Sequence, residues 1–193
     1  MSVAELDQIR REIVAHPSNA WALDLGYQPV YVTDPAARVL VIGQAPGIRA
    51  QETGIPWNDA SGERLRDWLG VDEATFRDPT RFGIVPMDFF FPGRGKTGDL
   101  PPRPDFAPTW HPRLLAQMPE VRLTLLIGDH AQRFYLGGRE SLTERVRRFR
   151  DYLPDRMPLV HPSPLNFRWQ SRNPWFETDV LPALRDRVAE LVG

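Results

Sequence analysis

The stretch Val39-Leu40-Val41-Ile42, ended by Gly43, carries the main indication of the fold. Four consecutive apolar residues bounded by a glycine are typical of a short strand that is buried on both faces. Three similar runs follow along the chain, at Phe82–Val85, Leu123–Ile127 and Leu159–Val160. Helical patterns alternate with these runs, so the sequence predicts an α/β fold. We expect a three-layer α/β/α sandwich around a short, mainly parallel sheet of about four strands.

Helical periodicity and punctuation by proline and glycine place the remaining elements. The predicted helices are Ala4–Ala15, Gly62–Leu69, Pro112–Met118, Ala131–Leu136, Leu142–Phe149 and Trp175–Leu191. The proline-rich stretch Pro92–Pro108 is predicted to be one long loop after the second strand. Long loops inside compact domains are usually functional or disordered.

Length and composition describe an ordinary globular chain. Its 193 residues predict a single domain over 1–193, and its 41% hydrophobic residues can form a core. Apolar runs are too short to cross a bilayer, and the first residues predict no signal peptide. The absence of cysteine excludes disulfides and thiolate metal sites. We therefore expect a cytoplasmic monomer without membrane association.

Charge by itself does not identify a partner. The net charge is −1, and all basic residues except Lys96 are arginine. The planar guanidinium group suits phosphate recognition, but codon usage explains an arginine-rich composition equally well.

Parallel strands in an open α/β sheet place ligands beyond their carboxyl ends. This rule selects four segments that we expect to meet in space although they are far apart in the chain. They are Gly43–Asp59, Met87–Pro102, Gly128–His130 and His161–Arg168.

Two of these segments carry distinctive motifs. The turn Gly43-Gln44-Ala45-Pro46-Gly47 would direct free backbone N–H groups outward, where they could bind a carbonyl oxygen or an anion; a purely structural tight turn is the alternative. The second motif, His161-Pro162-Ser163-Pro164-Leu165-Asn166, holds a histidine between a strand and a rigid turn. An isolated histidine is more often structural, but this position favours a functional role.

The two motifs together resemble the signatures of the uracil-DNA glycosylase superfamily, and the run Leu125–Gln132 is also similar to that family. The resemblance covers about Arg38 to Asn166, and the second motif follows the first by 118 positions. It implies a DNA repair enzyme that flips uracil out of DNA, hydrolyses the N-glycosidic bond and leaves an abasic site and free uracil. It implies neither a metal nor another cofactor.

The resemblance also implies roles for individual residues. Gly43, Gln44 and Ala45 would bind the O2 edge of uracil, and His161 would donate to O2 as charge develops there. Trp57 would stack on the base, although a core tryptophan is the alternative. Four residues are predicted to contact DNA: Ser163, Leu165, Asn166 and Arg168. Ser163 would bind a phosphate, and Leu165 would enter the base stack.

Two departures from the best-known branch of that family affect the catalytic interpretation. Ala45 stands where that branch has an aspartate that positions water, so Asp59 becomes the candidate for this task, with Glu52 in reserve. A helix N-cap is the alternative role for Asp59. Gly47 stands where that branch has a tyrosine that excludes thymine, so exclusion of thymine stays open.

A third departure concerns Asp88. The family often reads the N3–H and O4 groups of uracil with an asparagine at this place. A protonated aspartate could do the same, whereas an ionised one accepts from N3–H only and leaves O4 to a backbone donor. A nearby arginine such as Arg94 would favour the charged form, and a solvated aspartate at a strand end is the alternative.

The sequence thus favours uracil excision from DNA over two other functions. One is a glycosylase for another deaminated or mismatched base, such as hypoxanthine or thymine. The other is a catalytically silent module that binds lesions, because Ala45 lacks the carboxylate.

Overall fold

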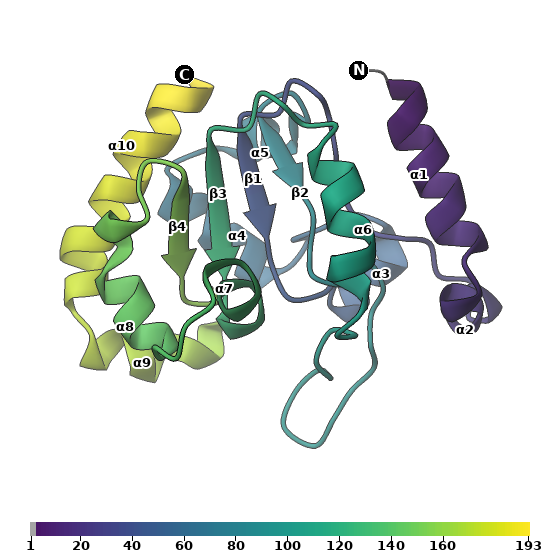
Figure 1. Ribbon diagram of the computed structural model, residues 1–193. Coiled ribbons are helices and arrows are strands. Elements are labelled where there is room, and N and C mark those ends of the chain that lie inside the picture. Colours follow the sequence, from purple (N-terminus) through teal and green to yellow (C-terminus); the bar gives the residue numbers. More distant parts are fainter. Residues whose placement is uncertain (1–2) are drawn as a thin grey trace.

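The computed structural model describes residues 3–193 and contains a four-stranded parallel sheet. Its strands are β1 (Val39–Ile42), β2 (Phe82–Ile84), β3 (Leu123–Ile127) and β4 (Arg156–Leu159), in the spatial order β2-β1-β3-β4. Val41 of β1 is paired with Ile84 of β2 and with Leu125 of β3. All four strands therefore end at the same edge of the sheet (Figure 1).

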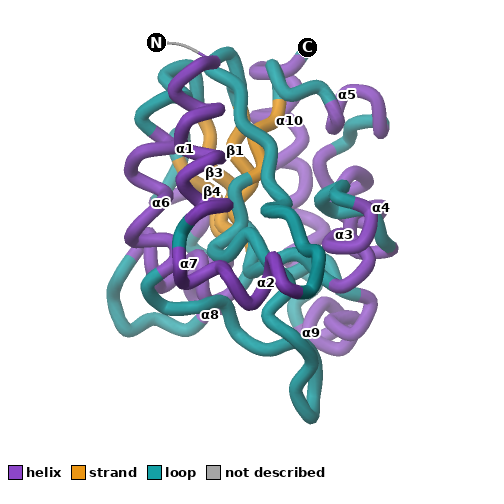
Figure 2. The backbone as a smooth tube through the Cα atoms, turned by 90° about the vertical axis from the view of Figure 1, so that its right-hand side faces the viewer, coloured by secondary structure: helices purple, strands orange, loops and turns teal. Residues whose placement is uncertain are grey.

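Helices cover both faces of this sheet (Figure 2). They are α1 (Val3–Ala15), α2 (Ala20–Asp24), α3 (Ile48–Thr53), α4 (Ala60–Leu69), α5 (Glu73–Arg77), α6 (Phe106–Leu115), α7 (Asp129–Leu136), α8 (Leu142–Arg147), α9 (Phe167–Arg172) and α10 (Leu181–Val192). A π-helical segment, Phe176–Val180, leads into α10. The three-layer α/β/α architecture that the sequence predicts is confirmed.

The alternation of side chains along β1 divides the core into two parts. Val39 and Val41 face a cluster that includes α4, α5 and α10. Leu40 and Ile42 face the other cluster, which includes α1 and α6. A strand that is buried on both faces explains why the run is continuously apolar rather than alternating.

Helix α6 differs from its predicted bounds. It begins at Phe106, six residues before the predicted start at Pro112, so the expected loop to Pro108 ends earlier. Phe106, Trp110 and Leu114 are buried at intervals of four residues and form an apolar stripe against the sheet. This packing outweighs the cost of Pro112 inside the helix.

Strand β4 also begins earlier than predicted, at Arg156 rather than at Leu159. Pro158 lies within it, opposite Leu126 of β3. Because β4 is at the edge of the sheet, a proline is tolerated there.

The connection between β2 and α6 positions the site. It extends beyond the carboxyl ends of the strands, whereas the amino and carboxyl termini lie at the opposite end of the molecule (Figure 1). Within residues 3–193, the structure contains no helix that is long and apolar enough to span a membrane.

Candidate active site

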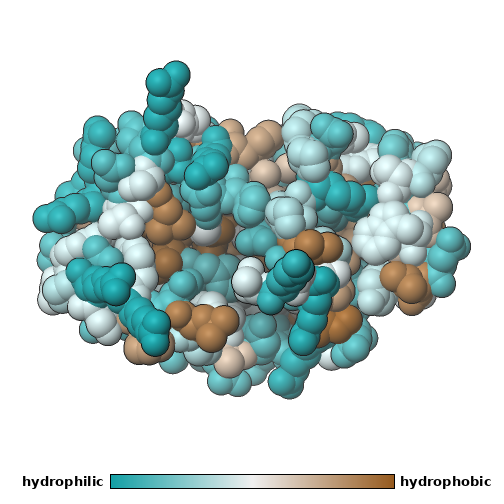
Figure 3. Space-filling view, turned by 90° about the horizontal axis from the view of Figure 1, so that it is seen from below, coloured by the Kyte–Doolittle hydropathy of each residue, from teal (hydrophilic) through white to brown (hydrophobic). Residues whose placement is uncertain are grey.

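A pocket of about 710 Å³ lies at the carboxyl ends of the strands. Figure 3 shows this end of the molecule, where apolar patches lie among polar and charged side chains. Four segments supply most of the lining: the Gly43–Gly47 turn, residues 56–61, residues 94–100 and residues 161–166. Three of the four segments that the sequence singles out therefore meet here.

The Gly43–Gly47 turn is hydrogen-bonded to the segment that follows β2. The carbonyl oxygens of Gly43 and Gln44 accept hydrogen bonds from the N–H groups of Met87 and Asp88, at 2.9 and 3.2 Å. The N–H groups of Gln44 and Ala45 have no hydrogen-bond partner within residues 3–193. Both residues line the pocket, so their N–H groups are candidates for binding a ligand there.

Trp57 lies against this turn in a strained conformation. Its φ of 56° is in the left-handed region, which non-glycine residues rarely adopt. A Cβ at Gly43 would lie 2.9 Å from the indole ring, and a Cβ at Gly62 would lie 1.8 Å from the Trp57 carbonyl oxygen. Arg77 donates to that same oxygen at 3.4 Å. The two glycines leave room for Trp57 at the pocket wall, and Arg77 holds its backbone. Backbone strain of this kind is often found at functional sites.

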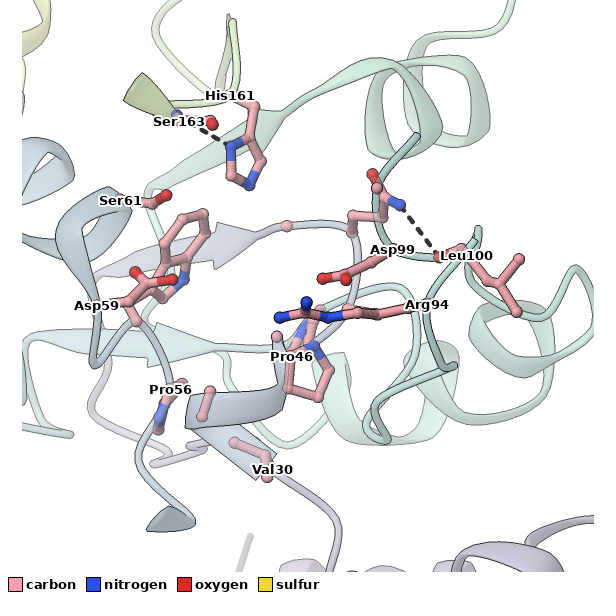
Figure 4. Close-up of a pocket in the computed structure, with 18 of the residues that line it drawn as sticks. Val30, Pro46, Pro56, Asp59, Ser61, Arg94, Asp99, Leu100, His161 and Ser163 are labelled. Atoms are coloured by element: carbon pink, nitrogen blue, oxygen red, sulfur yellow. Dashed lines mark hydrogen bonds between the residues drawn. The ribbon is translucent and has the colours of Figure 1, made fainter. Parts of the chain in front are cut away.

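The His161 ring lies 5.5 Å from the Trp57 ring, measured between centroids. Its Nδ1 accepts a hydrogen bond from the Ser163 N–H at 3.1 Å, so a neutral ring carries its proton on Nε2. Burial lowers the pKa of His161, and the carboxylates of Asp59 and Asp99 oppose that shift. The result is a neutral imidazole whose ring is directed into the pocket (Figure 4).

Asp59 combines the two roles that the sequence leaves open as alternatives. Its Oδ1 accepts from the Gly62 N–H at 2.9 Å, which makes it the N-cap of α4. The same side chain lines the pocket and is exposed. The cap fixes the direction of the carboxylate and leaves Oδ2 available to a water or a ligand.

The second motif forms a compact turn of its own. The Asn166 side chain donates to the His161 carbonyl oxygen at 2.8 Å, and the Ser163 hydroxyl oxygen accepts from the Leu165 N–H at 3.2 Å. Leu165 is 85% exposed at the pocket rim. Arg168 is exposed outside the lining, where its guanidinium lies over the Phe167 ring.

Asp88 does not line the pocket, contrary to the prediction that it reads the base. It is 1% exposed, and Arg103 donates to both carboxylate oxygens, at 2.7 and 2.9 Å. The N–H groups of Arg103 and Phe90 add two further hydrogen bonds. The arginine that pairs with Asp88 is therefore Arg103 and not Arg94, the nearby arginine that the sequence suggests.

Two other expectations also need correction. Glu52 lies on α3, is exposed and does not line the pocket. The segment Gly128–His130 begins α7 outside the pocket lining, where Asp129 pairs with Arg133 and Arg145. The carboxyl end of β3 therefore contributes no residue of this segment to the pocket lining.

The sequence interpretation did not assign a role to a hairpin that borders the pocket. Residues 93–100 fold back on themselves, with hydrogen bonds from the Gly95 N–H to the Gly98 oxygen and from the Leu100 N–H to the Gly93 oxygen. Arg94 and Asp99 lie opposite each other in this hairpin, and both line the pocket. The three glycines spaced through residues 93–98 were the available signal, because they are typical of a tight turn.

Comparison with known proteins gives two findings. A family model described as "Uracil DNA glycosylase superfamily" matches residues 30–185. A solution NMR structure from Methanosarcina acetivorans, of a protein provisionally named a uracil DNA glycosylase, is 20% identical in sequence. That match covers 81% of this chain and 94% of the other, with a TM-score of 0.45.

Proposed function

The chain belongs to the uracil DNA glycosylase superfamily and is a DNA glycosylase, and we propose that it excises uracil. In this reaction a water molecule replaces the base at C1′ of the sugar. The N-glycosidic bond breaks, its electron pair leaves with the base, and an abasic site and free uracil remain. The barrier falls when the enzyme stabilises the negative charge that develops on the departing uracil.

The observation that carries this proposal is the geometry of His161, which lines the pocket beside Trp57. The Ser163 N–H occupies Nδ1, and burial lowers the pKa of the ring. A neutral imidazole with its proton on Nε2 can donate a hydrogen bond to uracil O2, so the ring does not have to be an imidazolium cation. The free N–H groups of Gln44 and Ala45 border the same pocket and can donate to the O2 edge of the base.

Asp59 is the candidate for positioning water and stabilising the cationic sugar. Its free oxygen borders the pocket, and the helix cap restricts its direction. Trp57 offers an aromatic surface for stacking next to His161.

The DNA itself would contact the rim. We infer that Leu165, an exposed apolar side chain on a rigid turn, enters the gap that a flipped base leaves. The Ser163 hydroxyl retains its own hydrogen to donate to a phosphate, and Arg168 supplies a nearby positive charge. We propose that the protein works on uracil-containing DNA as a cytoplasmic monomer.

One observation favours thymine in a mismatch as a second substrate. Within residues 3–193, and apart from the two chain neighbours of Gly47, only the Asp99 carboxylate lies within 4 Å of where a Gly47 side chain would begin. The structure therefore has no bulky group at that position to exclude a 5-methyl group.

The test is single-turnover cleavage of matched duplexes that contain uracil, thymine or hypoxanthine. We expect uracil to be cleaved, with His161→Ala reducing the rate by about 10²–10³ and leaving duplex binding nearly unchanged. Asp59→Asn keeps a good N-cap, so its rate loss reports on chemistry rather than on folding. His130→Ala, a substitution at an exposed histidine outside the pocket, is the control.

Two outcomes would contradict the proposal. Wild-type rates in the His161→Ala variant would remove the proposed catalytic role of this ring. Tight binding of the uracil duplex without cleavage by the wild type would instead favour the lesion-binding module.

A further inference from the structure

Recognition of uracil needs more than the O2 contacts described above. Uracil and cytosine share O2, but uracil presents N3–H and O4, whereas cytosine presents a bare N3 and an amino group. A selective pocket therefore needs an acceptor opposite N3 and a donor opposite O4. Asp88 cannot be that acceptor in this arrangement, because four donors already surround its carboxylate.

The hairpin over residues 93–100 brings a donor and an acceptor to the pocket instead. Arg94 and Asp99 are directly opposite each other, so their side chains emerge on the same face of the hairpin. Both point into the pocket (Figure 4). Within residues 3–193, neither side chain forms an ion pair, whereas Asp88 and Arg103 are joined in one.

This hairpin is attached to the turn that would bind O2. The Gln44 side chain donates to the Leu100 carbonyl oxygen at 3.4 Å. The Asp99 carboxylate lies 3.9 Å from the position that a Gly47 Cβ would take. Asp99 is thus next to the Gly43–Gly47 turn, and its charge also acts on His161.

We propose that Asp99 and Arg94 read the N3–H and O4 groups of the flipped base. This inference rests on the proposed excision of uracil. Starting from His161, the pocket offers a donor for O2, then the Asp99 acceptor, then the Arg94 donor beyond it (Figure 4). This is the order of O2, N3–H and O4 along the edge of uracil.

The same order disfavours cytosine. In the pose that keeps O2 at His161, the bare N3 of cytosine faces the Asp99 carboxylate, and its amino group faces the Arg94 guanidinium. Both contacts are repulsive and leave desolvated groups unpaired, which is a strong means of rejection.

The experiment measures single-turnover cleavage of uracil, cytosine and 4-thiouracil in one duplex sequence. Asp99→Ala should lower the rate on uracil about 10- to 100-fold, because a hydrogen bond to a charged group is lost. Asp99→Asn can present an amide N–H to the bare N3 of cytosine, so the preference for uracil should fall at least about tenfold.

Arg94 is tested through O4. Wild type should cleave 4-thiouracil more slowly than uracil, because sulfur is a weaker acceptor than oxygen. Arg94→Met should be slow on both bases, and the ratio of the uracil rate to the 4-thiouracil rate should fall. Controls with the same charge change outside the pocket are Asp105→Asn and Arg139→Met, and Thr97→Ala tests a general disturbance of the hairpin.

The outcomes separate this inference from the function on which it rests. A wild type that leaves uracil intact overturns the proposed function and, with it, this assignment. If the wild type cleaves uracil while Asp99→Asn and Arg94→Met keep its base preference, the hairpin does not read the base and the inference alone is overturned.

Discussion

Asp88 and Asp99 lie eleven positions apart in the same connection between β2 and α6, but their surroundings differ completely. Asp88 is 1% exposed and is held by Arg103, which also donates to Ser18 and Asn19. Asp99 is exposed in the pocket and forms no ion pair within residues 3–193.

This contrast shows what the residue type alone leaves open. The Asp88 carboxylate is paired with a guanidinium inside the protein, so removing either partner leaves the other without its counter-charge. A carboxylate at a pocket without a partner is free for a ligand. The same loop therefore has a structural end at Asp88 and a recognition end at Asp99.

The largest expected effect tests this division through stability. Asp88→Ala should lower the free energy of unfolding by about 3–5 kcal/mol, because it leaves the Arg103 guanidinium without its partner. Asp99→Ala should change it by less than about 0.5 kcal/mol. Urea denaturation of both variants measures the difference.

A double variant tests whether the stability loss in Asp88→Ala comes from the unpaired charge of Arg103. Replacing Arg103 by methionine in the Asp88→Ala background removes the uncompensated charge and should restore part of the lost stability. Equal stability losses in Asp88→Ala and Asp99→Ala would erase the contrast between the two ends of the loop.

The next effect is a pH dependence of stability, and it concerns His111, which contacts the same connection. The His111 ring is 1% exposed, and its Nε2 contacts the Pro86 carbonyl oxygen at 3.0 Å. Burial lowers the pKa of His111 from 6.5 to about 4. Between these pH values the unfolded chain binds a proton that the folded chain does not, so stability rises with pH across this window.

The full shift corresponds to about 3 kcal/mol, lost as the pH falls from 6.5 to 4. We expect His111→Gln to flatten this part of the pH dependence, as measured by urea denaturation between pH 4 and 7. Substitution of the exposed His130 serves as the control. An unchanged slope in His111→Gln would assign the pH dependence to other groups.

The smallest effect belongs to the exposed rim. Leu165→Ala should slow cleavage in duplex DNA about tenfold, or roughly 1.4 kcal/mol, but have little effect on single strands, because only a duplex stack must be opened. Stability should stay within about 0.5 kcal/mol, since Leu165 is 85% exposed. Leu25→Ala, at another exposed leucine, is the matched control. Equal losses on both substrates would contradict a wedge role.

The sequence alone determined the architecture and two of the segments that build the pocket. Continuous apolar runs predict strands buried on both faces, and the bounds of β1 and β3 match their prediction. The Gly43–Gly47 turn and the His161 motif follow directly from such strands, so their location at one sheet edge could be predicted. These features depend on residues that are neighbours in the chain.

Only the tertiary structure decided which charges are compensated. Asp88 meets Arg103 because the start of α6 packs against the segment that follows β2, where the Phe106 ring contacts Phe89 and Phe90. The Trp21, Phe90 and Phe106 rings surround the guanidinium. Asp99 reaches the pocket because its hairpin contacts Gln44, which is 56 positions away from Leu100. No local pattern contains these partners, since burial and counter-charges come from segments that meet only after folding. They determine whether an aspartate holds the fold or faces a ligand.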